Sequence, residues 1–230
     1  MTRWKAAATH LALSIVVIGG IALAAFLLWY PHALYRVAGL DRILLVMLAI
    51  DLTAGPLLTL ILYRKGKWGL KFDLTVIAIC QIAFLAYGLS TLWQGRPVFL
   101  VGTPDTFTLV FANEISDADL AKAPRPEWRK LSWTGPQLVG TYMPDAPDER
   151  RAIMEAFMAG GAGIERSPER YKPYEEVAPR ILARSQRHAE DKMGTQALRI
   201  APIVSRRAES QLLIDATSAM PVQTVRVTEN

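Results

Sequence analysis

The chain has 230 residues, with 26 Lys and Arg against 21 Asp and Glu, and a sequence pI of about 9.4. The excess positive charge is confined to residues 1–94, which hold 8 basic and 3 acidic residues, whereas residues 95–230 hold 18 of each. This neutral balance excludes a nucleic-acid-binding role for the longer part. The only cysteine is Cys80, which excludes a disulfide framework there.

Three long apolar runs occupy the first 94 residues, at about 11–30, 43–63 and 74–93. Each is long enough to cross the hydrocarbon core of a bilayer as a helix, which takes about 20 residues. We therefore expect a membrane protein with three N-terminal transmembrane helices over residues 1–94. The first run contains a sequence like a signal-peptide cleavage site, Ala22-Leu23-Ala24, but its apolar stretch is too long for a signal peptide, so an uncleaved anchor is favoured.

The distribution of basic residues predicts the orientation of these helices, because Lys and Arg collect on the cytoplasmic side. Basic residues precede the first run and crowd the link between the second and third runs: Arg3, Lys5, Arg64, Lys65, Lys67 and Lys71. We expect the N-terminus and the 64–72 loop in the cytoplasm. The 31–42 loop and residues 95–230 then lie outside, which in a bacterium is the periplasmic side of the inner membrane.

Polar residues within the apolar runs are the least expected feature of the anchor. Asp51 lies near the middle of the second run, where an ionised carboxylate costs at least a few kcal/mol. It is either a contact for a partner's membrane segment or a proton-linked switch, or else a protonated or hydrogen-bonded side chain within the bundle. Asp73 is expected to complement the N-terminus of the third helix. Lying about 18 Å apart along the helix direction, the two cannot form a peptidase dyad.

Gly55-Pro56 interrupts the second run, where the proline removes a backbone hydrogen bond and is expected to distort the helix.

Residues 95–230 predict one small α+β domain. Strands are expected at 98–101, 106–111, 137–143, 198–204, 211–215 and 222–227, the last two as a hairpin. Ser116 is expected to cap a short helix, and longer helices are expected at 145–157, ended by Gly160-Gly161, and at 176–187. Residues 123–133 are expected as a linker. Tyr171-Lys172-Pro173-Tyr174 is either loop packing, which we favour, or a partner surface.

No pattern of catalytic or cofactor-binding residues is present. His10, His32 and His188 are too scattered for a metal cluster by local spacing, and no common hydrolase, metalloprotease or nucleotide-binding motif occurs. The sequence therefore predicts a protein that is not an enzyme and that has no cofactor and no metal.

The chain resembles the type IV pilin accessory proteins (the TfpX/TfpZ family). The resemblance covers about the first 100 residues. It rests on four segments in order: Arg3-Trp4-Lys5 with Trp29-Tyr30-Pro31; Asp51-Leu52 followed by Gly55-Pro56-Leu57-Leu58-Thr59-Leu60; Gly69-Leu70-Lys71-Phe72-Asp73-Leu74 with Gln81 and Ala86-Tyr87-Gly88; and Arg96-Pro97-Val98. The later part matches in layout more than in residues.

The resemblance implies a chaperone-like inner-membrane accessory that helps its cognate major pilin reach or join a type IV pilus, without catalysis. It also implies that membrane lipid and other inner-membrane proteins of pilus assembly are partners of the chain. A pilin has an apolar N-terminal helix and a periplasmic head, so such a partner could be touched at two points. The candidate membrane contacts are Asp51, Gly55, Pro56, Asp73 and Gln81.

Two other classes remain open. A membrane-anchored periplasmic sensor or regulatory subunit would need a partner protein, because the cytoplasmic parts are too short for an output domain. A transporter subunit would need more helices or more polar helix faces.

Overall fold

A computed structural model describes residues 2–39, 45, 49–187 and 197–225. The chain divides into two compact units. The helical unit contains Met1–Leu27 and Leu40–Gln94, and the sheet unit contains Leu28–Gly39 and Gly95–Asn230.

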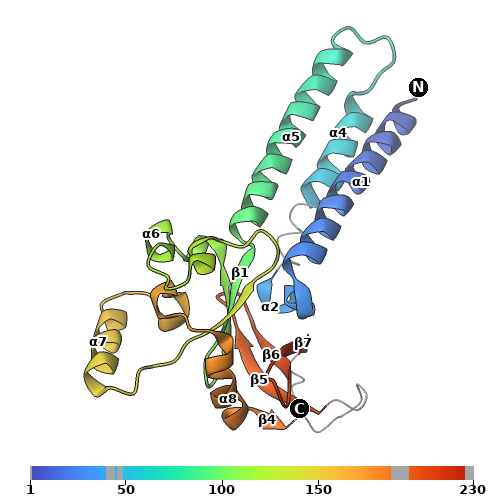
Figure 1. Cartoon of the computed structure of the whole chain (residues 1–230). Helices are drawn as coiled ribbons and strands as arrows, with labels where there is room; N and C mark the ends of the chain where they lie inside the picture. Colours follow the sequence, from blue (N-terminus) through green and yellow to red (C-terminus); the bar gives the residue numbers. More distant parts are fainter. Residues whose placement is uncertain (1, 40–44, 46–48, 188–196, 226–230) are drawn as a thin grey trace. The chain divides into compact units, whose positions relative to one another are not determined.

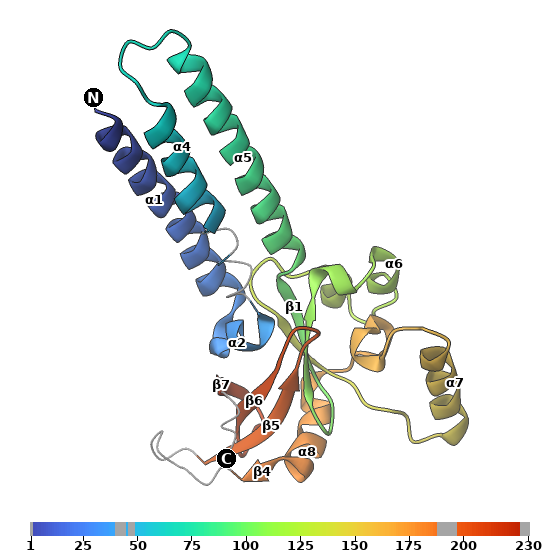
Figure 2. The same ribbon diagram turned by 180° about the vertical axis from the view of Figure 1, so that it is seen from behind.

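The helical unit contains α4 (Gly55–Leu62), α5 (Leu70–Gln94) and α1 (Arg3–Trp29) except its last two residues, which belong to the sheet unit. The three helices lie side by side (Figures 1 and 2). Within the described residues, α1 and α5 are long and apolar enough to cross a membrane, and a shorter apolar helix spans Leu52–Leu62. Part of the predicted second run, residues 43–44 and 46–48, lies outside the described residues.

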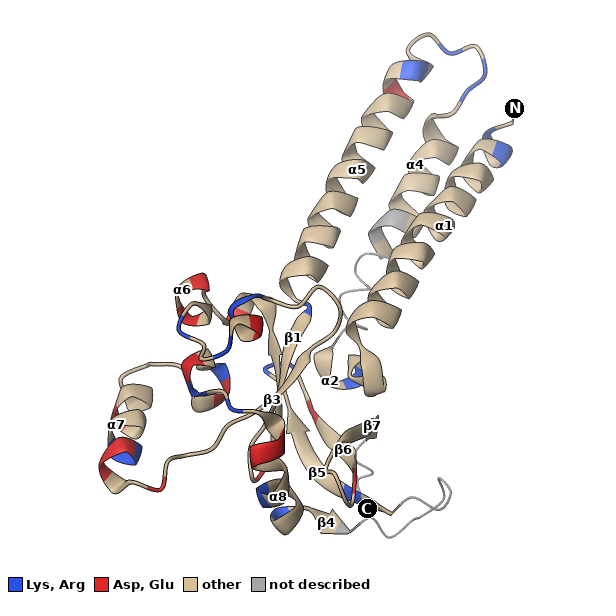
Figure 3. Ribbon diagram, in the orientation of Figure 1, with Lys and Arg blue, Asp and Glu red and all other residues tan. Residues whose placement is uncertain are grey.

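Charge is confined to the ends of these helices (Figure 3). In α1 it is carried by Arg3 and Lys5, in α5 by Lys71 and Asp73, and α4 has none. Most large apolar side chains of α1 and α5 face outward. Because an α-helix satisfies its own backbone hydrogen bonds, the uncharged middle parts of these helices suit a lipid environment.

The distortion predicted at Gly55-Pro56 is a π-helical turn, η2 (Ile50–Ala54), which leads directly into α4. Pro56 has no N–H to donate to the preceding turn, and a wider turn of this kind is a common way to accommodate the missing bond. Pro56 itself is buried.

The sheet unit is built on one mixed sheet with strand order β3-β1-β2-β5-β6-β7. The strands are β1 (Pro97–Gly102), β2 (Phe107–Phe111), β3 (Gln137–Gly140), β5 (Leu198–Val204), β6 (Glu209–Asp215) and β7 (Pro221–Val225). The hairpin β1–β2 and the meander β5–β6–β7 are antiparallel, and a parallel pairing of β2 with β5 joins them. The predicted sheet-containing domain is therefore confirmed, and so is the predicted hairpin over 211–215 and 222–225, whereas residues 226–227 lie outside the described residues.

The helices of this unit are α2 (Tyr35–Ala38), α6 (Asp117–Leu120), α7 (Pro147–Met158) and α8 (Tyr174–Arg184). Single 3₁₀ turns lie at η1 (Pro31–Ala33), η3 (Ala112–Glu114), η4 (Pro126–Arg129), η5 (Ile164–Arg166) and η6 (Pro168–Arg170). Ser116 caps α6 as predicted, because its Oγ accepts from the Asp119 backbone N–H at 3.2 Å. The end of α7 at Gly160 is also as predicted, with a φ of +90° that favours glycine.

The sheet core is aromatic and continuous. Phe99, Phe107 and Phe111 are fully buried, and every residue of β1 is buried because both faces of that strand are covered. The α8 helix packs closely on β1 and β3. A Cβ on Gly140 would overlap the Val177 side chain, so only glycine permits this approach.

The strand expected over 137–143 ends at Gly140. Two further segments differ from the sequence prediction. The helix expected over 176–187 runs from Tyr174 to Arg184, and Gln186–Arg187 instead form β4, which pairs with β5. The linker expected over 123–133 contains η4, which buries Trp128 in the core. Both differences arise from partners distant in sequence, which local propensity does not report.

The segment Leu28–Gly39 is an integral part of the sheet unit. Leu34, Val37 and Ala38 are fully buried. The Ser205 hydroxyl donates to the Val37 carbonyl oxygen at 2.7 Å, and the Arg207 guanidinium donates to the Ala38 carbonyl oxygen at 2.9 Å. The connection that follows α1 is therefore hydrogen-bonded to the turn between β5 and β6.

Candidate partner-binding site

Three of the five residues proposed as membrane contacts share one groove. Gly55, Asp73 and Gln81 line an open cavity of about 300 Å³ between α4 and α5. The rest of its lining is mainly apolar: Ala54, Leu58, Leu62, Phe72, Val76, Ile77, Cys80 and Phe84. The structure thus brings together residues from two sequence segments.

Gly55 permits the close approach of α4 and α5. A Cβ built on Gly55 would overlap the side-chain amide of Gln81. Small residues at helix contacts in membranes serve this purpose, because they let polar side chains and backbones come close.

The Gln81 amide belongs to a polar cluster that also includes His10 of α1 and Thr59 of α4. His10 Nδ1 lies 2.7 Å from the Thr59 hydroxyl, and His10 Nε2 is hydrogen-bonded to the Gln81 side-chain oxygen. Because an amide oxygen only accepts, His10 Nε2 is the donor in its hydrogen bond with Gln81. One cluster therefore links all three helices.

The polar cluster lies at the wall of a second, larger cavity of about 520 Å³. Its lining comes from α1, the end of α4 and α5, and is largely apolar: Ala6, Thr9, His10, Leu13, Ser14, Val17, Ile18, Thr59, Tyr63, Leu74, Ile77, Ala78, Gln81, Ile82 and Leu85. We call this cavity the three-helix groove. It offers an apolar surface with a few hydrogen-bonding groups, which suits an apolar helix better than a polar small molecule.

The remaining two candidates have different surroundings. Asp73 lies in the first turn of α5, as predicted, and its carboxylate pairs with the Lys67 ammonium at 2.5 Å. Asp51 lies in the π-helical turn, and its side chain falls outside the described parts of the chain. Pro56 is buried beside Gly55 and lines neither groove.

The sheet unit presents its own candidate surface around α7. Met154, Phe157 and Met158 expose their side chains on this helix, whereas Ile153 is buried. An open cavity of about 620 Å³ lies between α7 and the turn after β1, and is lined by both signs of charge, including Asp105, Asp145, Arg150, Arg180 and Arg184. Arg184 pairs with Asp105, and Arg180 pairs with Asp145 at 3.6 Å.

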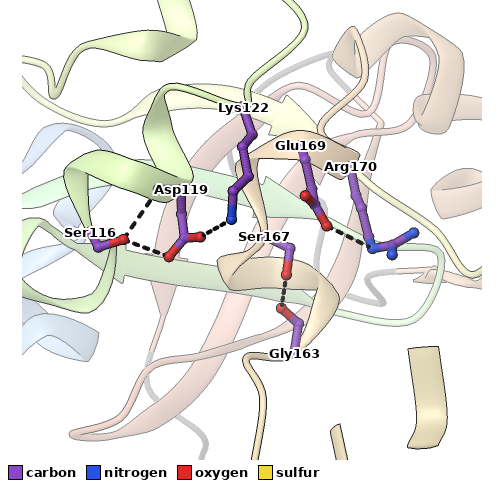
Figure 4. Close-up of polar contacts among 7 residues, drawn as sticks. All are labelled: Ser116, Asp119, Lys122, Gly163, Ser167, Glu169 and Arg170. Atoms are coloured by element: carbon purple, nitrogen blue, oxygen red, sulfur yellow. Dashed lines mark hydrogen bonds and ion pairs between the residues drawn. The ribbon is translucent and has the colours of Figure 1, made fainter. Parts of the chain in front are cut away.

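A third group of polar side chains lies where α6 packs near η6 (Figure 4). Asp119 accepts hydrogen bonds from Ser116 at 2.7 Å and Lys122 at 2.8 Å, and Lys122 and Ser116 lower the pKa of this carboxyl. Glu169 pairs with Arg170 at 3.7 Å. These exposed groups satisfy one another, which is typical of a solvated surface.

The segment 171–174, which leads into α8, packs with its two tyrosines in the core, the interpretation favoured from the sequence. Tyr171 and Tyr174 are buried, and their hydroxyls donate to the carbonyl oxygens of Glu165 at 2.7 Å and Ala219 at 2.6 Å. Burial raises the pKa of both phenols. Over the described ranges, no group of three or more His, Cys, Asp and Glu is placed to hold a metal ion.

The fold defines a class of protein: N-terminal apolar helices that could span a membrane, followed by a sheet-containing domain. Three proteins from Dichelobacter nodosus are similar to this chain in sequence. The fimbrial assembly protein of serogroup E1 is 28% identical over 181 residues, 77% of this chain and 69% of that protein, and that of serogroup I is 27% identical over the same shares. The fimbrial assembly protein of serogroups C1 and C2 is 30% identical over 122 residues, 52% of this chain and 92% of that protein.

The chain therefore belongs to the family of fimbrial assembly proteins, a type IV pilus assembly-related family, and the resemblance found in the sequence is confirmed at this level. No family model matches the chain. No solved structure matches it significantly either.

His10 and Thr59 are the residues of the polar cluster that the sequence analysis did not select as candidate contacts, and His10 is the one that joins the cluster together. Its partners Thr59 and Gln81 lie 49 and 71 residues away, so local spacing gave no indication of the cluster. The sequence did carry one signal for this cluster. His10 is a polar side chain at the start of an otherwise apolar run, and the other two runs also contain polar side chains, Thr59 and Gln81, with which it could bond.

Proposed function

We propose that this protein is a non-enzymatic inner-membrane accessory that assists its cognate major type IV pilin during pilus assembly. The observation that carries the proposal is family membership, since all three relatives are named for fimbrial assembly. The structure supports it with a groove between apolar helices and a separate sheet unit.

The division of the chain supports three membrane crossings. Leu28–Gly39 and Gly95–Asn230 form one compact unit, so the chain must leave that unit at about residue 40 and return to the same side at about residue 95. If α5 crosses the membrane, as its length and apolar composition allow, we expect a second crossing within residues 40–69. With α1 this would make three crossings, and the basic 64–72 loop supports a periplasmic location for the sheet unit.

The three-helix groove is the proposed membrane contact for the pilin. Its occupant is the apolar N-terminal helix of the pilin before assembly. Leu13, Val17, Ile82 and Leu85 supply apolar walls, while the cluster of His10, Thr59 and Gln81 supplies hydrogen-bonding groups at one point. Gly55 and Pro56 at the start of α4, and Asp73 at the start of α5, shape the helices around this groove. Asp51 lies in the π-helical turn that leads into α4.

The exposed apolar side chains of α7 are the proposed contact for the pilin head. Met and Phe side chains exposed on a helix favour association with another protein. Contacts through the membrane groove and through α7 would add by effective concentration, because both belong to one chain.

Deletion of the gene in its own bacterium tests the proposal. We expect surface pili to be lost while pilin transcript persists, and a plasmid copy to restore piliation. Loss of pilin transcript would instead support the sensor or regulatory anchor. Unchanged piliation and unchanged transcript would contradict both.

A further inference from the structure

The loop Leu131–Pro136, which we call the Trp133 loop, is held by the two points at which the chain leaves its apolar helices. The indole Nε1–H of Trp29, the last residue of α1, donates to the Trp133 carbonyl oxygen at 2.9 Å. Arg96, which follows α5 by two residues, donates through Nε to the Ser132 carbonyl oxygen at 3.1 Å. Two neighbouring carbonyls thus accept hydrogen bonds from Trp29 and Arg96, the residues of the sheet unit that lie next to its junctions with α1 and α5.

The loop is shaped by Gly135, which packs against the same place. Its φ is +65°, and a Cβ there would lie 3.4 Å from the Leu28 carbonyl oxygen and 3.5 Å from the Pro31 ring. Within the loop, the Ser132 hydroxyl accepts from the Thr134 backbone N–H at 3.2 Å. The loop is therefore fixed in position rather than passing over the surface.

Trp133 is 73% exposed, although its backbone carbonyl accepts the hydrogen bond from Trp29. Arg96, by contrast, is buried, and burial lowers the pKa of its guanidinium. Lys130 is also exposed, three residues before Trp133. A large exposed indole with a nearby cation is unusual on a water-facing surface and typical of a membrane interface.

We propose that the Trp133 loop is a membrane-contacting element of the sheet unit, with the Trp133 indole in the headgroup region of the bilayer. The argument is one of depth. If α1 and α5 span the bilayer, Trp29 and Arg96 lie at its surface, and carbonyls bonded to them lie at the same level. The indole would then contact the bilayer in addition to the three covalent connections between the two units, which follow residues 27, 39 and 94.

Fluorescent labelling of the full chain tests this placement. The native cysteine is removed by Cys80→Ser, and single cysteines are introduced by Thr134→Cys, next to the intact Trp133, or by Met158→Cys on α7. Met158 is 79% exposed and serves as the matched control. Each protein is labelled with an environment-sensitive dye and placed in nanodiscs of phosphatidylethanolamine and phosphatidylglycerol, with or without nitroxide lipids.

We expect the label at position 134 to emit at shorter wavelength than the label at 158. It should be quenched more by a headgroup nitroxide than by one deep in the acyl chain, and Trp133→Ala in the same background should weaken this quenching. The label at 158 should be quenched by neither. A label at 134 as water-like and as unquenched as that at 158 would overturn the proposal, and so would quenching that Trp133→Ala leaves unchanged. Because piliation is not measured, this result is independent of the proposed function.

Discussion

The Ser205 hydroxyl donates a hydrogen bond to the Val37 carbonyl oxygen at 2.7 Å, joining residues 168 positions apart in the chain. Val37 follows the first apolar helix and Ser205 follows β5. This contact, with that of Arg207 to the Ala38 carbonyl oxygen, makes the connection after α1 part of the sheet unit. The same arrangement is the basis of the proposed three-crossing topology.

Leu34 tests whether this connection stabilises the sheet unit. Its side chain is fully buried, so Leu34→Ala should lower the free energy of unfolding by about 2–5 kcal/mol, through lost apolar contacts and a residual cavity. The measurement is a urea titration of the full chain in detergent micelles, followed by near-ultraviolet circular dichroism. Leu23→Ala, on the exposed side of α1, is the control and should leave the transition in place. Equal effects of the two substitutions would contradict the assignment.

Gly55 tests the packing of α4 against α5. Gly55→Ala should force the Gln81 amide away and destabilise the helical unit by about 1–3 kcal/mol, the usual cost of overpacking. Gln81→Ala in the same chain removes the obstacle, so the double variant should lose less than the sum of the single effects. Unfolding of the helices by sodium dodecyl sulfate in mixed micelles provides the measurement.

The matched control for this experiment is Gly20→Ala on α1, where a Cβ meets nothing within 4 Å. This variant should unfold like the unsubstituted chain. Strict additivity of Gly55→Ala and Gln81→Ala would show that the two positions do not touch.

The parts of the fold that depend on neighbouring residues could be predicted from the sequence. The period and length of the apolar runs indicated α1 and α5, β-rich runs indicated β1, β2 and β5, and Ser116 and Gly160 marked helix ends. The parts that depend on distant partners could not. The docking of Leu34 and Val37 on the sheet unit requires residues from the last part of the chain, which no local pattern reports.

The candidate site shows the same division. Gly55 and Gln81 were selected from a family resemblance, and the structure places them in contact. The link of Gln81 to His10 and Thr59 could not be predicted from the sequence, because these residues come from three different helices.

Tyr30 predicts how the stability of the sheet unit depends on pH. Burial raises the pKa of its phenol to about 12, and the charge of Arg207 partly opposes this shift. The unfolded phenol ionises near its ordinary pKa of 10, so the unfolded state loses its proton first as pH rises. The stabilisation is therefore full below about pH 10 and is lost as the pH rises towards 12.

Urea titrations at a series of alkaline pH values provide the measurement. Tyr30→Phe should weaken the alkaline loss of stability, while the loss from the other buried phenols, Tyr171 and Tyr174, remains. An identical pH dependence in Tyr30→Phe and the unsubstituted chain would contradict the role given to Tyr30.

Cysteine accessibility tests the orientation of the chain. In a Cys80→Ser background, Trp68→Cys reports on the basic 64–72 loop and Met158→Cys on α7, and both native side chains are exposed. With a membrane-impermeant maleimide and cells whose outer membrane alone is permeabilised, position 158 should be labelled. Position 68 should be labelled only after lysis. Labelling of both positions in intact spheroplasts would contradict the topology.

The most direct test of the central claim is photo-crosslinking in living cells at two isoleucines of α5. Ile82 lines the three-helix groove, whereas Ile79 lines neither groove, and their side chains are 66% and 61% exposed. With a photoreactive amino acid at either position, we predict an adduct with the major pilin from position 82 and a much weaker one from position 79. Equal adducts from both positions, or an adduct from position 82 only with a protein other than pilin, would contradict a pilin-binding groove.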